Sequence, residues 1–335
     1  MRSADCARPN RENEVRDPHT VKTSSVERCG SETAVRHHYS AIDTAIGVLA
    51  ARASSYYELT KPGIAAFVTI LAGVGFYMGA RGRADIFSLL HALLGTALAT
   101  AGALALNQWA ERKADARMAR TRLRPLPSGR VAPLEALGFG ALLVVVGVSY
   151  LATTAGSLPA CLTAAAAATY LLAYTPLKSR SYLATLVGAF PGAFPAVIGW
   201  TAATGRIELG AVVLFAIAFL WQLPHVLALA WLLREDYARV GFFLTPPTDG
   251  SGARIGRHMV YHSISLLVLS GFPTLLGLAG LIYLGGATVL GLVMLALTSL
   301  AAANMTVIRA RRVFLYSLLY QPFLMALLLL DTVRA

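Results

Sequence analysis

From residue 63 onward, the chain alternates long apolar runs with short polar segments. Each run has the length, about 20 residues, that lets a helix cross the hydrocarbon core of a bilayer. The pattern predicts an all-α integral membrane protein in which nine transmembrane helices form a bundle around a central cavity. We place the spans at residues 63–80, 86–109, 132–152, 157–175, 182–203, 208–232, 259–283, 285–305 and 313–331.

The chain ahead of the first span has a different character. Residues 1–45 are polar and lack a hydrophobic period, so we expect a disordered cytosolic tail followed by a membrane domain over residues 46–335. Acidic residues occur throughout the tail, unlike in a mitochondrial transit peptide, and no apolar core of a secretory signal is present. A bacterial cell (inner) membrane therefore fits better than the mitochondrial inner membrane.

Composition and charge agree with a protein embedded in lipid. Hydrophobic residues make up 56% of the 335 positions and charged residues 14%, against about 25% charged in ordinary soluble domains. The net charge of +12 would also suit nucleic acid, but the basic residues lie in loops between spans, so we expect no nucleic-acid partner. The loops after even-numbered spans carry 16 Lys and Arg and the opposite side carries 4, which predicts a cytosolic N-terminus by the positive-inside rule.

The end of the second span carries the most informative polar pattern. Asn107, Glu111 and Asp115 follow one another at i, i+4 spacing, so their oxygen atoms lie on one face of a helix and could bind Mg²⁺. Basic residues whose guanidinium or ammonium groups can bind phosphate lie in or after this stretch: Arg112, Lys113, Arg117, Arg120, Arg122, Arg124 and Arg130. The pattern predicts a diphosphate site. The alternative, a solvated helix with internal ion pairs, is disfavoured because Asn107 lies within the apolar run.

A second acidic cluster follows span six on the same predicted side of the membrane. Glu235 and Asp236 lie between Arg234 and Arg239. Two acidic clusters facing one cavity could hold metal ions on both sides of a diphosphate. The alternative is a solvated helix end whose acids are balanced by the two arginines.

Other candidates lie at span ends or within spans. Lys178 and Arg180 follow span four and could bind a diphosphate, or could be ordinary positive-inside residues. His225 lies deep in span six, 11 residues before Asp236, which would place both on one face of a regular helix; it could contact a substrate or a neighbouring helix. Span five is rich in helix breakers and is expected to face the cavity. Four aromatic residues could line that cavity or simply pack: Trp200, Phe219, Trp221 and Trp231.

Several motifs together closely resemble a known family. They are N-x-x-x-E-x-x-x-D with R-T-x-x-R-P-L-P-x-G-R, Y-T-x-L-K from Tyr174, P-G-A-x-P-x-x-I-G-W, W-Q-x-P-H from Trp221, and R-E-D-Y. The first acidic motif and the Tyr–Lys pattern are typical of UbiA-type intramembrane prenyltransferases. The arginine-rich extension, W-Q-x-P-H and R-E-D-Y resemble its protoheme IX farnesyltransferase (heme O synthase) branch. The resemblance covers about residues 55–330.

The resemblance implies a reaction and roles for the matching residues. Farnesyl diphosphate ionises with the help of Mg²⁺, the 2-vinyl group of heme b attacks the allylic carbon, and water completes heme O for terminal oxidase assembly. Asn107, Glu111, Asp115 and Asp236 would hold Mg²⁺–diphosphate and act in catalysis with Lys178. The resemblance gives substrate-binding roles to Arg120, Arg124, Tyr174, Arg180, Trp221, His225 and Glu235. A heme A synthase is the implied downstream partner.

Two alternative functions remain open from the sequence. A related prenyltransferase could act on a quinone precursor or another aromatic acceptor. A secondary transporter of an anionic metabolite would also use broken helices, but it predicts inverted repeats and polar residues near the bilayer midplane. We find no convincing repeat, and the polar residues cluster at one end of the spans.

Overall fold

The computed structural model describes residues 46–246 and 249–333. The chain divides into two units, Met1–Ala51 and Arg52–Ala335. In the first unit the described residues are 46–51, which are helical and exposed; the predicted tail over residues 1–45 lies outside the described residues. The second unit contains the helices of the predicted membrane domain.

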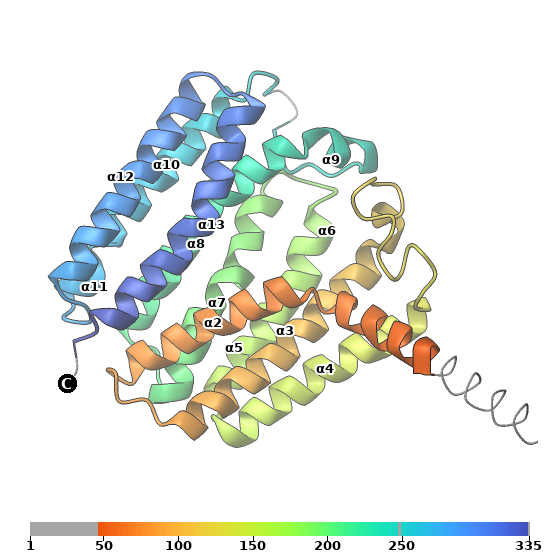
Figure 1. Cartoon of the computed structure of the whole chain (residues 1–335), viewed down its shortest axis with the longest axis horizontal. Helices are drawn as coiled ribbons and strands as arrows, with labels where there is room; N and C mark the ends of the chain where they lie inside the picture. Colours follow the sequence, from red (N-terminus) through yellow and green to blue (C-terminus); the bar gives the residue numbers. More distant parts are fainter. Residues whose placement is uncertain (1–45, 247–248, 334–335) are drawn as a thin grey trace, which may run out of the picture. The chain divides into compact units, whose positions relative to one another are not determined.

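The second unit is built from helices (Figure 1). After a helical segment at residues 52–59 come α2 (Pro62–Gly79), α3 (Ile86–Asp115), α4 (Pro133–Thr154), α5 (Ser157–Ala168), the π-helix η1 (Thr169–Tyr174), α6 (Thr175–Leu177), α7 (Ala184–Thr204), α8 (Leu209–Leu232), α9 (Arg234–Val240), α10 (Ala253–Leu269), α11 (Phe272–Leu275), α12 (Leu281–Ala303) and α13 (Val307–Leu330). Within the described part of the chain, eight helices have the length and composition to cross a membrane: α2, α3, α4, the continuous segment Ser157–Leu177, α7, α8, α12 and α13. The chain is therefore an all-α multi-pass membrane protein, as predicted.

Local sequence explains where several of these helices begin. Pro62 and Pro133 occupy the first positions of α2 and α4, where the missing N–H of proline costs no helical hydrogen bond. The Asp85 side chain caps α3 by accepting a hydrogen bond from the Ser88 backbone N–H at 2.8 Å. Such a cap pairs one of the N–H groups that the first helical turn leaves free.

The predicted seventh span, residues 259–283, is wrong at both ends. Helix α10 begins earlier and has 17 residues, and the chain then turns into the short helix α11. Pro273 lies in the first turn of α11, and Gly277 has a positive φ of 63°, a conformation that favours glycine. The apolar composition continues through this turn, so hydropathy alone did not reveal the break.

Close helix contacts hold α3 in place. A Cβ at Gly102 of α3 would lie 2.6 Å from the Gly140 carbonyl oxygen of α4, and one at Gly147 of α4 would lie 2.5 Å from the Ala99 backbone nitrogen. Small residues at such positions let two helix backbones approach closely in a membrane, where packing replaces the hydrophobic effect between helices. The α3–α4 contact therefore fixes the helix that carries the predicted acidic face.

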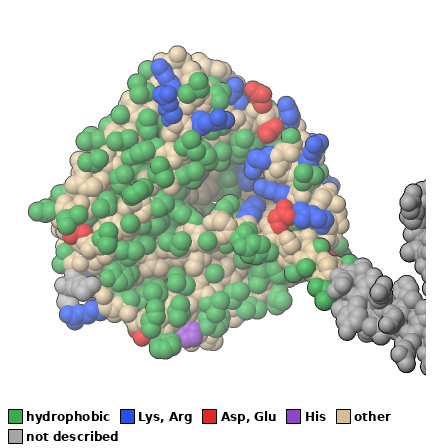
Figure 2. Space-filling model, in the orientation of Figure 1, with side chains coloured by type: hydrophobic (Ala, Val, Ile, Leu, Met, Phe, Trp, Pro, Cys, Tyr) green, Lys and Arg blue, Asp and Glu red, His purple; other side chains and the backbone are tan. Residues whose placement is uncertain are grey.

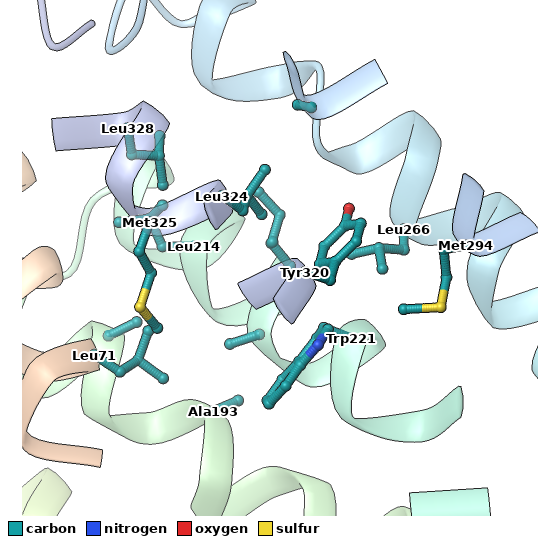
Figure 3. Close-up of a cluster of buried hydrophobic side chains, with 14 of the residues drawn as sticks. Leu71, Ala193, Leu214, Trp221, Leu266, Met294, Tyr320, Leu324, Met325 and Leu328 are labelled. Atoms are coloured by element: carbon teal, nitrogen blue, oxygen red, sulfur yellow. The ribbon is translucent and has the colours of Figure 1, made fainter. Parts of the chain in front are cut away.

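A large cluster of buried apolar side chains joins α2, α7 and α8 to α10, α12 and α13. Figure 3 shows Trp221 of α8 and Tyr320 of α13 within this cluster. The Trp221 indole N–H donates a hydrogen bond to the Ser317 carbonyl of α13 at 2.8 Å. This contact fixes α8 against α13.

Candidate active site

The predicted acidic face lies on the last three turns of α3, which runs without interruption to Asp115. The side chains of Asn107 and Asp115 are each 1% exposed. A carboxylate so deeply buried needs a charged or hydrogen-bonding partner, because desolvation of an isolated charge is costly.

Each of the three residues has a cationic partner. The Lys61 ammonium donates to Asn107 Oδ1 at 3.0 Å, and the Lys178 ammonium donates to Glu111 Oε1 at 2.6 Å. Arg124 Nη1 donates to both oxygens of Asp115 at 2.9 Å. Oxygen ligands suited to a hard cation therefore lie directly beside groups suited to phosphate oxygens.

The segment after α3 folds back so that Arg124 can reach Asp115. The Thr121 hydroxyl donates to the Asp115 carbonyl at 2.8 Å, which closes the turn at the end of the helix. Farther on, Leu126 and Val131 are buried against Leu59. A small apolar cluster thus anchors the arginine-rich segment next to the acidic face.

Lys61 is the member of the site that the sequence reasoning missed. It lies directly before Pro62, with a left-handed φ of 46°, so the start of α2 directs it toward Asn107. Burial, reinforced by the nearby Arg124 charge, lowers the pKa of Lys61 to about 7. The signal in the sequence was a lysine at the start of a span, at the same end of the bundle as the end of α3.

Lys178 reaches the site from the end of span four. The π-helix η1 lies shortly before this lysine in the chain. The Lys178 ammonium lies 4.3 Å from the centre of the Tyr174 ring. Burial opposes the ammonium charge, yet Tyr174 and Glu111 outweigh it and hold the pKa of Lys178 above its ordinary value. The Tyr170 hydroxyl donates to Asn107 Oδ1 at 3.2 Å. The π-helix therefore supplies two tyrosines to the site, and the lysine follows one short helix later.

The second acidic cluster lies near this site without joining it. Asp236 faces Arg239 at 3.4 Å, and Glu235 lies 3.5 Å from Arg234 with its side chain 77% exposed. Within the described residues, no three His, Cys, Asp or Glu side chains are arranged to hold one metal ion. The predicted four-residue ligand set is therefore not assembled in this structure.

Helix α9 is nevertheless close to the Lys178 segment. Tyr237 of α9, like Tyr174 and Leu177, packs against one small buried cluster, and the Phe243 backbone N–H donates to the Lys178 carbonyl at 2.7 Å. α9 also lies at the same end of the bundle as the segment after α3 (Figure 1). Because Tyr237 packs there, the adjacent residue Asp236 also lies close to the site.

One expectation about this cluster is corrected. Helix α8 ends at Leu232, and Asp236 belongs to the separate helix α9, so His225 and Asp236 do not share a face of one regular helix. Arg120 and Arg180, two further predicted substrate-binding residues, are exposed.

A cavity of about 550 Å³ lies beside this site and shares two tyrosines with it. Tyr170 and Tyr174 line it together with Phe67, Trp221 and His225. The prediction for span five is confirmed, because Gly188, Pro191, Gly192 and Pro195 of α7 also line the cavity. Figure 2 shows this face hollowed near its centre, with Lys and Arg side chains gathered on one side of the hollow.

Of the four aromatic residues considered for the cavity wall, Trp221 lines it. Trp200 is buried in the core, and its indole N–H donates to Glu208 at 3.2 Å. Trp231 is buried in the same core, and Phe219 packs edge-on against Phe190 at 4.9 Å between ring centres. For these three, packing rather than the cavity is the correct assignment.

The fold and the site together define a class of protein. A model of the UbiA prenyltransferase family matches residues 66–327, and the chain belongs to that family. The protoheme IX farnesyltransferase of Solibacter usitatus is 42% identical over 285 residues, covering 82% of this chain and 98% of that protein. The protein of the same name from Myxococcus xanthus is 40% identical over 282 residues, covering 84% and 95%.

Solved structures share the fold. A digeranylgeranylglyceryl phosphate synthase superposes with a TM-score of 0.72 at 16% identity, covering 84% of this chain and 98% of the other. A UbiA homologue from Archaeoglobus fulgidus bound to GPP and Mg²⁺ gives a TM-score of 0.55 at 15% identity, covering 82% and 99%. Because the chain belongs to a prenyltransferase family, the alternative function as a secondary transporter is rejected.

Proposed function

We propose that this chain transfers the farnesyl group of farnesyl diphosphate to the 2-vinyl group of heme b, giving heme O and diphosphate. The carbon–oxygen bond to the diphosphate breaks, a carbon–carbon bond forms to the vinyl group, and water adds a hydroxyl group and loses a proton. The relatives' shared name supports the acceptor. The observation that carries the proposal is the set of three oxygen-bearing residues, each paired with a cation, beside the cavity and joined to its wall by Tyr170.

The donor set on α3 fits a magnesium ion. Asn107, Glu111 and Asp115 offer only oxygen ligands, as a hard cation requires, and Asp236 would complete the set from α9. When bound, Mg²⁺ would neutralise charge on the diphosphate. Lys61, Lys178 and Arg124 would then turn from their present oxygen partners to the phosphate oxygens, and stabilise the charge that develops as the diphosphate leaves.

The cavity suits the apolar parts of the two substrates. Its wall includes the rings of Phe67, Tyr170 and Trp221, whose faces can stabilise an allylic cation. The glycine-rich face of α7 leaves room for the substrates, since a Cβ at Gly188 would lie 2.6 Å from Tyr174. His225, at the wall beside Trp221, would contact heme through its imidazole and bind the iron.

The membrane topology follows from the charge asymmetry of the loops. We assign α10 as a ninth span, although its 17 residues cover about 26 Å against a hydrocarbon core of about 30 Å. The N-terminus and the active-site segments then face the cytosol of a bacterial cell. A heme A synthase would use the product.

The direct test uses the purified protein in liposomes with heme b, farnesyl diphosphate and Mg²⁺. Mass spectrometry should detect heme O, and EDTA should abolish it. Asp115→Asn should lower the rate at least about 100-fold, since it removes the charge that binds the metal, while the protein still inserts. Glu208→Gln changes a carboxylate that is paired with Arg206 away from the site and should keep the wild-type rate.

Three outcomes would count against the proposal. Prenylation of a quinone precursor with no heme O would keep the diphosphate site and reject the acceptor. An active Asp115→Asn variant would reject the metal–diphosphate role of α3. Failure to turn over any prenyl diphosphate would reject the enzyme itself.

A further inference from the structure

Ser317 of α13 contacts the cavity-lining histidine from outside the cavity. Its side chain is 0% exposed, and its hydroxyl oxygen lies 2.7 Å from Nδ1 of His225 on α8. The same hydroxyl lies 2.6 Å from the Phe314 carbonyl oxygen. One hydroxyl group therefore faces two possible partners.

Hydrogen counting assigns the direction of both bonds. A serine hydroxyl carries one hydrogen, and a carbonyl oxygen can only accept. The contact with Phe314 is a hydrogen bond only if Ser317 donates that hydrogen to the carbonyl. Ser317 must then accept a hydrogen bond from His225, so Nδ1 of His225 carries the hydrogen. In a neutral imidazole this leaves a lone pair on Nε2.

The surroundings keep the imidazole in this orientation. The His225 ring stacks on Trp221 at 5.4 Å and on Phe314 at 4.9 Å between ring centres. Trp221 in turn donates its indole N–H to the Ser317 carbonyl at 2.8 Å. The three residues that surround the imidazole are thus joined to one another, and a rotation of the ring would disturb all of them.

Nε2 is available to a molecule in the cavity. His225 lines the cavity. In the described part of the chain its Nε2 has no hydrogen-bond partner and is not buried. A histidine whose Nδ1–H is held by a hydrogen-bond acceptor, with Nε2 free, is the usual arrangement of an imidazole that binds a metal.

We propose that Ser317 is a positioning residue that sets the tautomer and orientation of His225, so that the Nε2 lone pair is presented to the iron of heme b. Ser317 does not touch the substrate and acts only through the imidazole. The inference rests on the proposed function for the identity of the substrate, but its geometry does not depend on farnesyl transfer.

The test measures heme binding without farnesyl diphosphate. Wild type, Ser317→Ala, Ser317→Thr and His225→Ala are titrated with heme b in detergent, and resonance Raman spectra of the ferrous complexes report the iron–histidine bond. Loss of a partner that orients a metal ligand typically weakens binding about 10- to 100-fold. Ser317→Ala should therefore bind heme more weakly by this factor, and its iron–histidine band should be weakened or shifted. Ser317→Thr keeps a hydroxyl, so it should show the heme affinity and the iron–histidine band of wild type.

The matched control is Ser263→Ala. Ser263 is also 0% exposed, and its hydroxyl donates to the Met259 carbonyl within α10 at 2.8 Å, so its loss should leave heme affinity and spectrum unchanged. An unchanged spectrum and affinity in Ser317→Ala would overturn the role of Ser317. Retention of the iron–histidine band in His225→Ala would overturn the inference as a whole.

These outcomes are separable from failure of the proposed function. If wild type forms no heme O but heme binding depends on Ser317 as expected, farnesyl transfer to heme is rejected and the positioning role stands. If heme O forms while Ser317→Ala matches wild type in both binding readouts, the positioning role is rejected alone.

Discussion

The ion pair between Lys178 and Glu111 gives the sharpest prediction about this site. The two side chains are each 10% exposed and lie 2.6 Å apart. A magnesium ion that binds Glu111 must displace this ammonium, and only a bound diphosphate offers the ammonium a new anionic partner. Lys178 should therefore oppose metal binding in the absence of diphosphate and favour catalysis in its presence.

The magnitude follows from the burial of the pair. Separating a buried ion pair costs about 3 kcal/mol or more, and about 1.4 kcal/mol corresponds to a factor of ten in an equilibrium constant. Lys178→Met should therefore strengthen diphosphate-free Mg²⁺ binding by about 100-fold. The same change removes a cation from the leaving diphosphate and should lower kcat by about 100- to 1000-fold.

Isothermal titration calorimetry of Mg²⁺ into the protein in nanodiscs measures the first effect, and the heme O assay measures the second. Lys113→Met is the matched control, because Lys113 is exposed on the same helix, and it should change neither. Mg²⁺ binding in Lys178→Met that equals or falls below that of wild type would falsify the exchange of partners.

Two further predictions concern pH and packing. Burial lowers the pKa of Lys61 to about 7, so its ammonium charge is present below that pH and lost above it. Farnesyl diphosphate should therefore bind more weakly at about pH 8 than at about pH 6. Lys61→Arg should flatten this dependence, because its guanidinium stays charged. A dependence that persists unchanged in the arginine variant would assign it to another group. Gly102→Ala would place a Cβ 2.6 Å from the Gly140 carbonyl and should destabilise the fold by about 1–3 kcal/mol, measured by unfolding in detergent. Gly138→Ala, with nothing within 4 Å of the added Cβ, is its control, and equal stabilities would contradict the packing argument.

The sequence alone determined the features that depend on local pattern. Apolar runs predicted the multi-pass helical class, because a membrane span is recognised from about 20 consecutive residues. The i, i+4 spacing predicted that Asn107, Glu111 and Asp115 share a face of one helix, since helical geometry repeats within a few residues. Helix breakers in span five predicted a cavity-facing helix, and α7 does line the cavity.

Only the tertiary structure decided which distant residues meet. Lys61 pairs with Asn107 across 46 residues of sequence, and His225 meets Ser317 across 92. The break after α10 and the separation of α8 from α9 occur within segments whose local pattern does not end where the helices end. The packing of neighbouring helices decides these points, and it also separates Trp221 at the cavity from Trp200 and Trp231 in the core. A one-dimensional pattern does not contain that information, because large apolar side chains such as Trp have the same hydropathy whether they meet lipid, a cavity or another helix.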